Sequence, residues 1–540
     1  MNQTVMQRMS LTKKQRSSTG TMMTIADPNT YRLHRHARET ASWQSNLLNE
    51  WALPMLVFGS MGAITWAIRG TSGWGGMDGT IVPGMMWALL WYYLCLRKGI
   101  DARSVVLWLG LGLSLGGELG YGQYVSWIQG YFQYKDQILD VSEWTGHLWF
   151  GICGLGWAAP GCILLGWALS GDKSVKRWLM RLTIPFVFAY LGALLIQWRP
   201  GWFFPNHDLG IYVDVFAPEL ERTLGRTVYT NTLNFMVAAW WLGAMVVAAL
   251  QRDRATLVMG VIVGLGFFVG FPLSALWCLG YTYAQGYVDW WKVWELNSGW
   301  NLGLLYVVAM YWAIRQVDKT HDPNGTPRKA PAPLDFWHEW FTDVGIVAGG
   351  ALLIFANGGE YFPKKILVVV PCYIIVMLLS TWPPNGGYNL DGVAEQRKRV
   401  ALIFTGFFLL FIMCHGLTDR LGIVTDLVTH EEVDQYDWPP MRVLLFIPMV
   451  VVLVAGTLYK LARALHGSWT GRPREGTPKL PIHMIDLMTF TGFVGATSIL
   501  GSGMDGIKIC VLYAVFLVFG IGAFTRLNRR LDAVDRRGGA

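Results

Sequence analysis

Apolar stretches of about 20 residues recur along most of this chain, and this recurrence constrains the fold more than any other feature. A soluble core does not require apolar runs of this length, whereas a helix needs about 20 apolar residues to cross the hydrocarbon of a bilayer. Only 15% of the residues are charged, against roughly a quarter in ordinary soluble domains. The alternating strands of membrane β-barrels are not found in the sequence. The sequence therefore predicts an all-α, polytopic integral membrane protein whose first partner is the lipid bilayer.

The apolar runs predict about 14 transmembrane helices within one helical domain, residues 51–525. A basic tail, residues 1–50, precedes this domain, and a basic tail, residues 526–540, follows it. The predicted spans are 51–68, 80–97, 104–122, 146–169, 178–197, 231–250, 255–279, 298–315, 341–357, 365–382, 400–417, 442–462, 485–500 and 507–524.

The loops between these spans alternate in charge. One set is basic and includes "GDKSVKR" (171–177) and "EQRKR" (395–399), while the other set is neutral or acidic and includes 123–145 and 429–438. Because Lys and Arg are retained on the cytoplasmic side, both termini are predicted to be cytoplasmic, in a plasma or inner membrane. The net charge of +8 lies mostly in these short loops and tails, so we expect no nucleic-acid partner.

Two stretches of the chain resemble each other at a constant offset, which predicts an internal repeat of residues 80–169 by residues 231–315. Structural repeats are common in transporters. The matching positions are Asp101, Gly112, Tyr131 and Glu143 in the first stretch and Asp253, Gly264, Tyr283 and Glu295 in the second.

The tetrapeptide Gly-Met-Asp-Gly occurs at Gly76–Gly79 and again at Gly503–Gly506. By the charge of the loops, both copies fall on the extracytoplasmic side. Each is expected to be a tight, glycine-flanked connection between two spans that aims one aspartate at a shared aqueous vestibule. A pair of convenient turns explains the pattern equally well.

Ionisable residues gather toward the extracytoplasmic third of the predicted spans. Glu118 in "SLGGELG" lies about 21 Å along its span, where a carboxylate is costly and is a functional candidate. It could instead pair with Arg69 as a structural carboxylate. Glu143 and His147 are four residues apart, which would place them on one helical face as a proton-handling pair. A helix start with Ser142 as the N-cap is the simpler interpretation.

The complete set of candidate substrate-binding or coupling residues combines these ionisable groups with nearby aromatic and amide side chains. It contains Arg69, Trp74, Asp78, Glu118, Tyr121, Gln123, Glu143, His147, Glu295, Glu360, His415, Asp419 and Asp505. Rings beside carboxylates and amides suit a polar, sugar-like small solute, because a ring stacks on C–H faces while carboxylates accept hydrogen bonds from hydroxyls. A cationic solute would also suit the rings.

The sequence lacks the motifs of several common classes of enzyme and metal site. The chain has no GxxxxGK[ST], HExxH or GxSxG motif and no Cys/His cluster with zinc spacing. All seven cysteines lie inside apolar runs, where they are expected to be small buried hydrophobes. We therefore predict no cofactor and no metal, with a proton or Na⁺ as the coupling ion.

Three functions remain open at this point. The sequence favours a secondary transporter-like protein that takes a polar small solute from an extracytoplasmic vestibule. The first alternative is a membrane-embedded enzyme that acts on a glycan or lipid-linked substrate at the outer face. The second is a structural or docking subunit. Homo-oligomers or other membrane subunits are compatible with each of these functions.

Overall fold

The computed structural model is mostly helical and describes the chain from Trp51 onward, with gaps. The described residues are 51–71, 77–97, 103–119, 124–170, 174–212, 222–318, 403, 406, 440–470, 479–499 and 503–538. The predicted tail 1–50 and the predicted spans 341–357, 365–382 and 400–417 lie outside them, apart from two isolated helical residues at 403 and 406. The predicted number of spans therefore stays a prediction.

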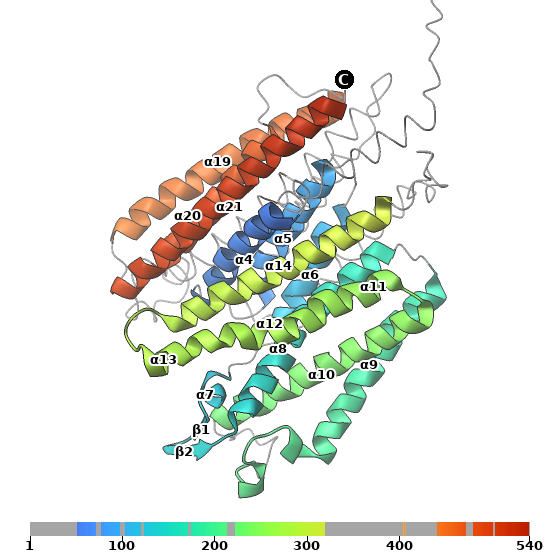
Figure 1. Ribbon diagram of the computed structural model, residues 1–540, viewed down its shortest axis with the longest axis vertical. Helices are drawn as coiled ribbons and strands as arrows, with labels where there is room; N and C mark the ends of the chain where they lie inside the picture. The colour runs from blue at the N-terminus through green and yellow to red at the C-terminus, as the bar shows by residue number, and fades with distance from the viewer. Residues whose placement is uncertain are drawn as a thin grey trace, which may run out of the picture. The chain divides into compact units, whose positions relative to one another are not determined.

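The helices follow one another in the order shown in Figure 1. They are α4 (Leu53–Thr71), α5 (Met77–Arg97), α6 (Arg103–Leu119), α7 (Val125–Ile128), α8 (Glu143–Ser170), α9 (Val175–Trp198), α10 (Arg222–Gln251), α11 (Arg254–Met259), α12 (Gly266–Ala275), α13 (Gly280–Tyr283), α14 (Trp290–Asp318), α19 (Pro440–Thr470), α20 (Leu480–Ile499) and α21 (Gly503–Gly538). Single turns of 3₁₀-helix form η2 (Pro200–Trp202), η3 (His207–Leu209) and η5 (Leu276–Leu279), and η4 (Gly260–Leu265) is a π-helix.

Seven helices in the described part of the chain are long and apolar enough to cross a membrane. They are Glu143–Ser170, Val175–Trp198, Leu224–Gln251, Arg254–Tyr283, Val450–Gly467, Leu480–Ile499 and Gly506–Ala533, and two shorter apolar helices cover Leu53–Ile68 and Val82–Cys95. This architecture is consistent with an integral membrane protein.

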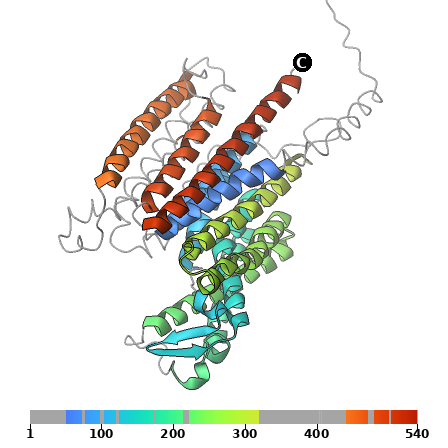
Figure 2. The ribbon, with the colours of Figure 1, turned by 60° about the vertical axis from the view of Figure 1, so that its left-hand side comes forward.

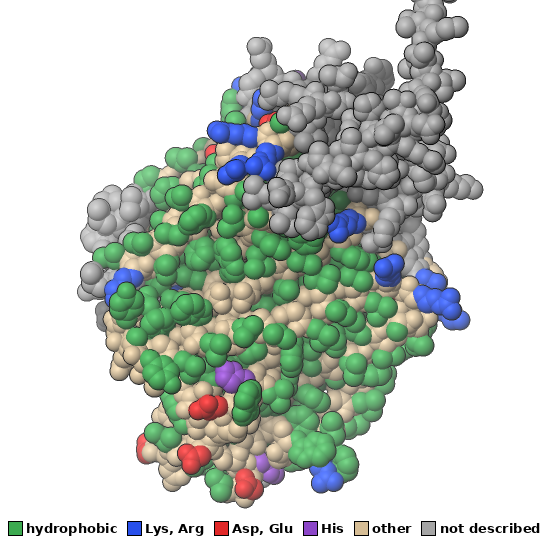
Figure 3. All heavy atoms as spheres, viewed as in Figure 1, with side chains coloured by type: hydrophobic (Ala, Val, Ile, Leu, Met, Phe, Trp, Pro, Cys, Tyr) green, Lys and Arg blue, Asp and Glu red, His purple; other side chains and the backbone are tan. Residues whose placement is uncertain are grey.

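Large apolar side chains cover the outside of these helices (Figure 3). On α9 an exposed stripe runs at helical spacing through Leu182, Phe186, Tyr190 and Leu194, and Phe186 is 61% exposed. A similar stripe follows Val261, Leu265, Val269, Leu273 and Leu276. Water would oppose so much exposed apolar surface, whereas lipid tails accept it. These stripes are therefore the faces that a bilayer would cover.

Close glycine contacts bring α4 and α14 together at the centre of the described core. The carbonyl oxygen of Gly299 would lie 2.4 Å from a Cβ built on Gly62, and the carbonyl of Gly62 would lie 2.1 Å from a Cβ built on Gly299. The indole of Trp87 on α5 donates to the Phe58 carbonyl of α4 at 3.0 Å. Helices in membranes often associate through small residues in this way. Figure 1 shows α4 and α14 side by side near the centre of the described helices.

We expect Gly299→Ala to lower the free energy of unfolding by about 1–3 kcal/mol, because the added methyl group forces two backbones apart. The matched control is Gly456→Ala in α19, where an added Cβ would meet no atom within 4 Å in the structure as described. Alanine is the better helix former, so the control should be neutral or slightly stabilising. Thermal unfolding of the purified variants measures the stability change caused by each substitution. Equal melting temperatures for the two variants would contradict the tight crossing.

A β-hairpin stands where the sequence predicts only an extracytoplasmic loop. Strands β1 (Tyr131–Tyr134) and β2 (Gln137–Asp140) pair antiparallel, with Tyr134 opposite Gln137, so Lys135 and Asp136 form a two-residue turn. Lys135 has a φ of 51°, a value that this kind of hairpin turn requires. The hairpin lies beside α7, and β1 also contacts α10 (Figure 2).

Positions related by the predicted repeat differ in structure. Tyr131 begins a β-strand, whereas Tyr283 ends the short helix α13. Glu143 is exposed, whereas Glu295 is buried. The described residues therefore do not support the predicted internal repeat.

The predicted carboxy-terminal tail is largely helical. Helix α21 continues without a break from Gly503 to Gly538, well past the predicted end of its span at 524. The apolar pattern ends near that point, but the backbone remains helical through "RLNRRLDAVDRRG". The cysteine prediction is confirmed for Cys95, Cys153, Cys162 and Cys278, which are buried and form no disulfide within the described residues. Cys510 is only partly buried.

Candidate functional site

A smaller set of polar side chains is buried within the mainly apolar and aromatic core of the described helices. Burial of ionisable groups between membrane helices is costly, so such groups are functional candidates by default. The buried polar residues within the helices include Arg181, Asn231, Asn234, Ser274, Lys292, Glu295, Ser298 and His483.

The start of α14 is fixed by one carboxylate. Asp289 Oδ1 accepts from the backbone N–H groups of Trp291 at 3.0 Å and of Lys292 at 3.3 Å. The phenol of Tyr281 donates to the same oxygen at 3.0 Å. An acidic side chain that caps the first turn satisfies N–H groups that have no partner in the helix and complements the helix dipole. Asp289 therefore sets where α14 begins and which residues occupy its first turn.

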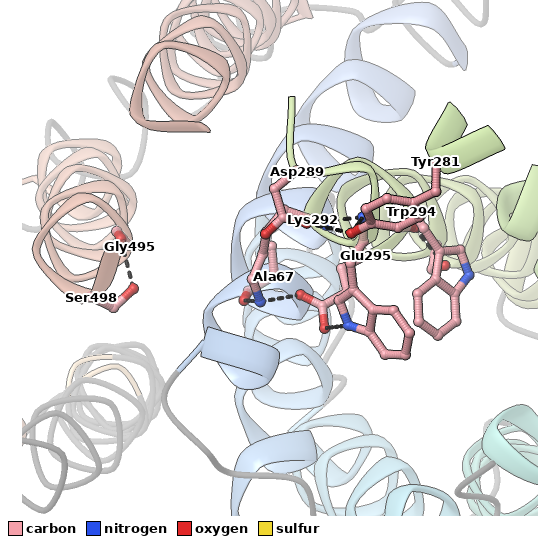
Figure 4. A network of polar contacts seen from close by, with 10 residues as sticks. Ala67, Tyr281, Asp289, Lys292, Trp294, Glu295, Gly495 and Ser498 are labelled. Carbon is pink, nitrogen blue, oxygen red and sulfur yellow. Dashed lines mark hydrogen bonds and ion pairs between the residues drawn. The ribbon is translucent and has the colours of Figure 1, made fainter. Parts of the chain in front are cut away.

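Lys292 and Glu295 form a buried ion pair on the second turn of α14 (Figure 4). Lys292 Nζ donates to Glu295 Oε2 at 2.5 Å, and Trp291 Nε1 donates to Glu295 Oε1 at 3.0 Å. The two charged residues are 7% and 4% exposed. Both carboxylate oxygens are therefore occupied by donors from the same helix.

The ammonium of Lys292 also reaches the neighbouring helix. Its Nζ lies 3.5 Å from the carbonyl oxygen of Ala67, in the last turns of α4. The carboxyl end of a helix carries a partial negative charge that favours a cation. Burying two charges is offset only when their geometry is good and their remaining atoms are hydrogen-bonded. This pair meets both conditions, and through Ala67 it links α14 to α4.

The segment Arg254–Tyr283, which packs against α14 and α8, is one continuous helix whose type changes along its length. An α-helical turn is followed by the π-helix η4, by α12 with Pro272 inside it, and then by the 3₁₀ turn η5. Proline removes a backbone donor from a helix, and π-helical turns occur frequently at functional sites.

Farther along α14, Asn301 makes polar contacts with α12. The amide of Asn301 donates to the Gly270 carbonyl at 3.1 Å and to Ser274 Oγ at 3.0 Å. The hydroxyl of Ser274 donates in turn to the Gly270 carbonyl at 2.8 Å. We use the name polar seam for the polar residues along α14, Lys292, Glu295 and Asn301, together with Ser274 of α12. The Lys292–Glu295 pair reaches α4 through Ala67, whereas Asn301 reaches α12.

A buried polar network lies at the end of the bundle that carries the β-hairpin, which we call the hairpin end. Tyr124 donates its hydroxyl proton to Asn231 Oδ1 at 2.9 Å, and Asn234 Nδ2 donates to the Tyr124 hydroxyl at 3.1 Å. Asn231 Nδ2 donates to the carbonyl of Phe203 at 2.7 Å. Burial raises the pKa of Tyr124 well above its ordinary value, so the phenol remains a donor at neutral pH. This network joins α7 and η2 to α10.

Aromatic rings packed edge to face connect this network to the polar seam. The ring of Phe150 on α8 lies 5.5 Å from Tyr124 and 5.6 Å from Trp294 on α14. Trp294 lies 4.8 Å from Trp291, whose indole binds Glu295. These separations are those of favourable aromatic pairs. The hairpin end thus packs directly onto the turn of α14 that carries the ion pair.

A second buried ion pair lies at the other ends of these helices. Arg181 Nη2 donates to Asp253 Oδ2 at 2.8 Å and to Ser170 Oγ at 2.9 Å. Asp253 also caps α11, accepting from the backbone N–H of Thr256 at 3.1 Å. The guanidinium of Arg181 lies 5.1 Å from the ring centre of Trp178. This junction holds the ends of α8, α9 and α11 together.

The structure describes the side chains of three predicted site residues. Glu295 enters the ion pair. Glu143 begins α8 and is exposed, and His147 lies one turn later and is half-buried beside the ring of Trp144 at 6.2 Å. Both lie on α8 as predicted, but no hydrogen bond or ion pair joins them in this described region. Glu143 instead approaches Gly130, next to the hairpin.

Four further predicted residues fall within described helices, although the description does not extend to their side chains. Arg69 is in α4, Asp78 in α5, Glu118 in α6 and Asp505 in α21. Six more lie outside the described residues, namely Trp74, Tyr121, Gln123, Glu360, His415 and Asp419. The roles predicted for these ten residues stay predictions.

The repeated Gly-Met-Asp-Gly motif marks helix starts. Helix α5 begins at Met77 and helix α21 begins at Gly503, so each aspartate lies in the first turn of a long helix. We had expected a tight connection at each copy, and the helix in fact begins within the motif. A carboxylate is favourable in the first turn of a helix, which gives both aspartates a structural reason to be there.

Several residues of the site are missed by reading the sequence. Lys292, Trp291, Asn301 and Ser274 are absent from the predicted set, as is the pair of Arg181 with Asp253. Lys292 could have been predicted from the sequence, because Lys292 and Glu295 have the i, i+3 spacing of an ion pair on one helix. Among the described residues, no group of three or more His, Cys, Asp or Glu side chains could hold a metal ion.

The chain matches no protein-family model, no curated protein and no solved structure.

Proposed function

We propose that this chain is a secondary transporter-like membrane protein that carries a polar, sugar-like small solute, with the Lys292–Glu295 pair as its coupling element. The observation that carries the proposal is this buried ion pair, which lies beside a helix that changes type four times along Arg254–Tyr283. Apolar residues of similar volume are often at least as stable as a buried charge pair. Asp253 of the second buried pair also caps α11, whereas Glu295 lies within α14 and caps no helix. A carrier needs such groups to bind and release an ion.

The polar seam supplies the chemistry that a polar solute requires. Asn301 and Ser274 offer amide and hydroxyl groups between α14 and α12, and Glu295 offers a carboxylate nearer the start of α14. Binding sites for small molecules combine a few such groups with aromatic walls, and Trp291 and Trp294 lie on the same turns. The coupling ion in this proposal is a proton or Na⁺.

We place the hairpin end on the extracytoplasmic side and the Arg181–Asp253 end in the cytoplasm. The basic loops predicted from the sequence support this orientation. On the face shown in Figure 3, most acidic side chains lie near the hairpin end, whereas most basic ones lie toward the opposite end. Both chain termini are cytoplasmic in this proposal.

An outer-face enzyme is supported less well. Hydrolytic or transfer chemistry on a glycan would use two carboxylates about 5–10 Å apart on a shared cleft. Glu143 is exposed at the start of α8, while Glu295 is buried and neutralised by Lys292. Two carboxylates in such different environments do not form the facing pair that this chemistry requires.

A solute screen on reconstituted protein tests the proposal. Proteoliposomes with an imposed proton or sodium gradient are exposed to D-glucose, sorbitol, glycerol or choline, and uptake is measured. We expect saturable, gradient-dependent uptake of at least one polyhydroxylated solute and none by protein-free liposomes. Chemical conversion of a glycan or lipid-linked substrate without uptake would favour the enzyme. Absence of uptake for every solute under both gradients would contradict the proposal.

A further inference from the structure

We infer that the ion exchanged at the Lys292–Glu295 pair is the proton, and that the Lys292 ammonium occupies the position in which a sodium-coupled site would hold Na⁺. The inference rests on the proposed transport function for its biological role. Its evidence is the geometry of the pair itself.

The oxygen atoms that a sodium ion would need already face donors, and one of these donors is a cation. Glu295 Oε2 accepts from the ammonium at 2.5 Å and Oε1 accepts from the Trp291 indole at 3.0 Å. The nearby Ala67 carbonyl faces the same ammonium at 3.5 Å. Hard cations are held by several oxygen ligands at once. Na⁺ could enter only by displacing Lys292, and it would then share the site with a second cation.

A proton can bind to Glu295 without displacing Lys292. When Glu295 takes one proton from water, its carboxylate becomes a neutral carboxyl group, and no other covalent bond changes. The Trp291 indole can still donate to the carboxyl group, while the ammonium keeps its charge and loses its anionic partner. Because Lys292 and Glu295 lie three residues apart on one helix, movements between helices leave the pair intact. Protonation is therefore the event that separates them.

The other titratable groups around Glu295 have different roles. Asp289 is committed to capping α14 and accepts from Tyr281 of α13. The Cys278 thiol of η5 is close enough to interact electrostatically with both Glu295 and Asp289. The contact from α4 is a backbone carbonyl, and α8 presents the ring of Phe150 to Trp294. Within the described residues, Glu295 is thus the carboxylate of this site that is paired with an ammonium.

Dicyclohexylcarbodiimide tests the inference, because this apolar reagent modifies protonated carboxyl groups in membranes. Purified full-length protein in nanodiscs is treated between about pH 9 and about pH 5, and labelling of Glu295 is measured by peptide mass spectrometry. Parallel samples contain sodium chloride or choline chloride at equal ionic strength. We expect labelling to rise about tenfold or more as the pH falls and to be the same in sodium and in choline.

The variant Lys292→Ala provides the second arm. Loss of the ammonium removes the cation paired with the Glu295 carboxylate, so labelling at neutral pH should rise by about tenfold. The vacated position should now accept a small cation. Sodium or methylammonium is therefore expected to suppress labelling in Lys292→Ala, although sodium has no effect in the wild-type protein.

Two outcomes would overturn the inference. Suppression of wild-type labelling by sodium would identify a sodium site, and pH-independent labelling would identify a static structural pair. Neither wild-type measurement requires Lys292→Ala to fold or any solute to be known. If the solute screen fails while labelling behaves as expected, the transport proposal falls and the proton assignment stands.

Discussion

Gradient-driven uptake should fall by about 100-fold or more when Glu295 is replaced by Gln, a loss of roughly 2.7 kcal/mol at 1.36 kcal/mol per tenfold. Glutamine keeps an oxygen for the Trp291 indole and the approximate volume of the side chain, but it neither carries charge nor binds a proton at neutral pH. The assay is uptake of whichever of D-glucose, sorbitol and glycerol the wild-type protein carries fastest. The variant removes the coupling group and leaves Lys292 buried without its anionic partner.

The matched control is Glu143→Gln, which makes the same chemical change at an exposed position on α8. We expect its uptake to stay within about twofold of wild type, since exposed surface substitutions away from special features have small effects. Thermal unfolding of both variants shows whether each is folded. A folded Glu295→Gln variant with wild-type uptake would remove this carboxylate from the mechanism.

The largest loss of stability is expected at the opposite end of the bundle. Replacing Arg181 by Met should lower the free energy of unfolding by about 3–5 kcal/mol, because it leaves the buried carboxylate of Asp253 without its cation. Arg181 is 1% exposed and contacts both Asp253 and Ser170. The measurement is thermal or denaturant unfolding of the purified variant in the same lipid or detergent.

Two further variants separate the ion pair from general effects of losing an arginine. Arg199→Met changes an exposed arginine beside the ring of Trp198 and should cost less than about 1 kcal/mol. The double variant Arg181→Met with Asp253→Asn removes both charges but keeps an oxygen to cap α11 through Thr256. This double variant should recover more than half of the unfolding free energy that Arg181→Met loses. A double variant as unstable as Arg181→Met would show that the charge pair is not the cause.

The positions of the helices could be predicted from apolar length alone, because a membrane span has a fixed thickness to cross. The run 178–197 falls within α9 and the run 146–169 falls within α8. Helix ends could not be predicted in this way. Helix α8 begins at Glu143 and α21 continues to Gly538, since hydropathy marks the lipid boundary while a helix is free to continue into water. The hairpin was missed because its strands have only four residues each.

The site was predicted only in part, for a related reason. Glu295 stands out in the sequence because an acidic residue beside an apolar run is costly. Its environment depends on partners distant in sequence, such as Ala67, which lies 225 residues from Lys292. Asn301 and Ser274 are likewise joined only once α12 packs on α14. Ordinary polar residues inside apolar runs give no signal of their own until such partners are known.

All of these proposals require the described helices to cross a membrane, with the hairpin on the extracytoplasmic side. Single cysteines at exposed positions test this directly in right-side-out vesicles with a membrane-impermeant maleimide. Three crossings, α8, α9 and α10, separate Ile138 of the hairpin from Arg252, and two separate Ile138 from Leu209. We predict that Ile138→Cys and Leu209→Cys react in intact vesicles and that Arg252→Cys reacts only after permeabilisation. Reaction of Ile138→Cys and Arg252→Cys from the same compartment would contradict the membrane-spanning arrangement, and the opposite pattern would reverse the proposed orientation.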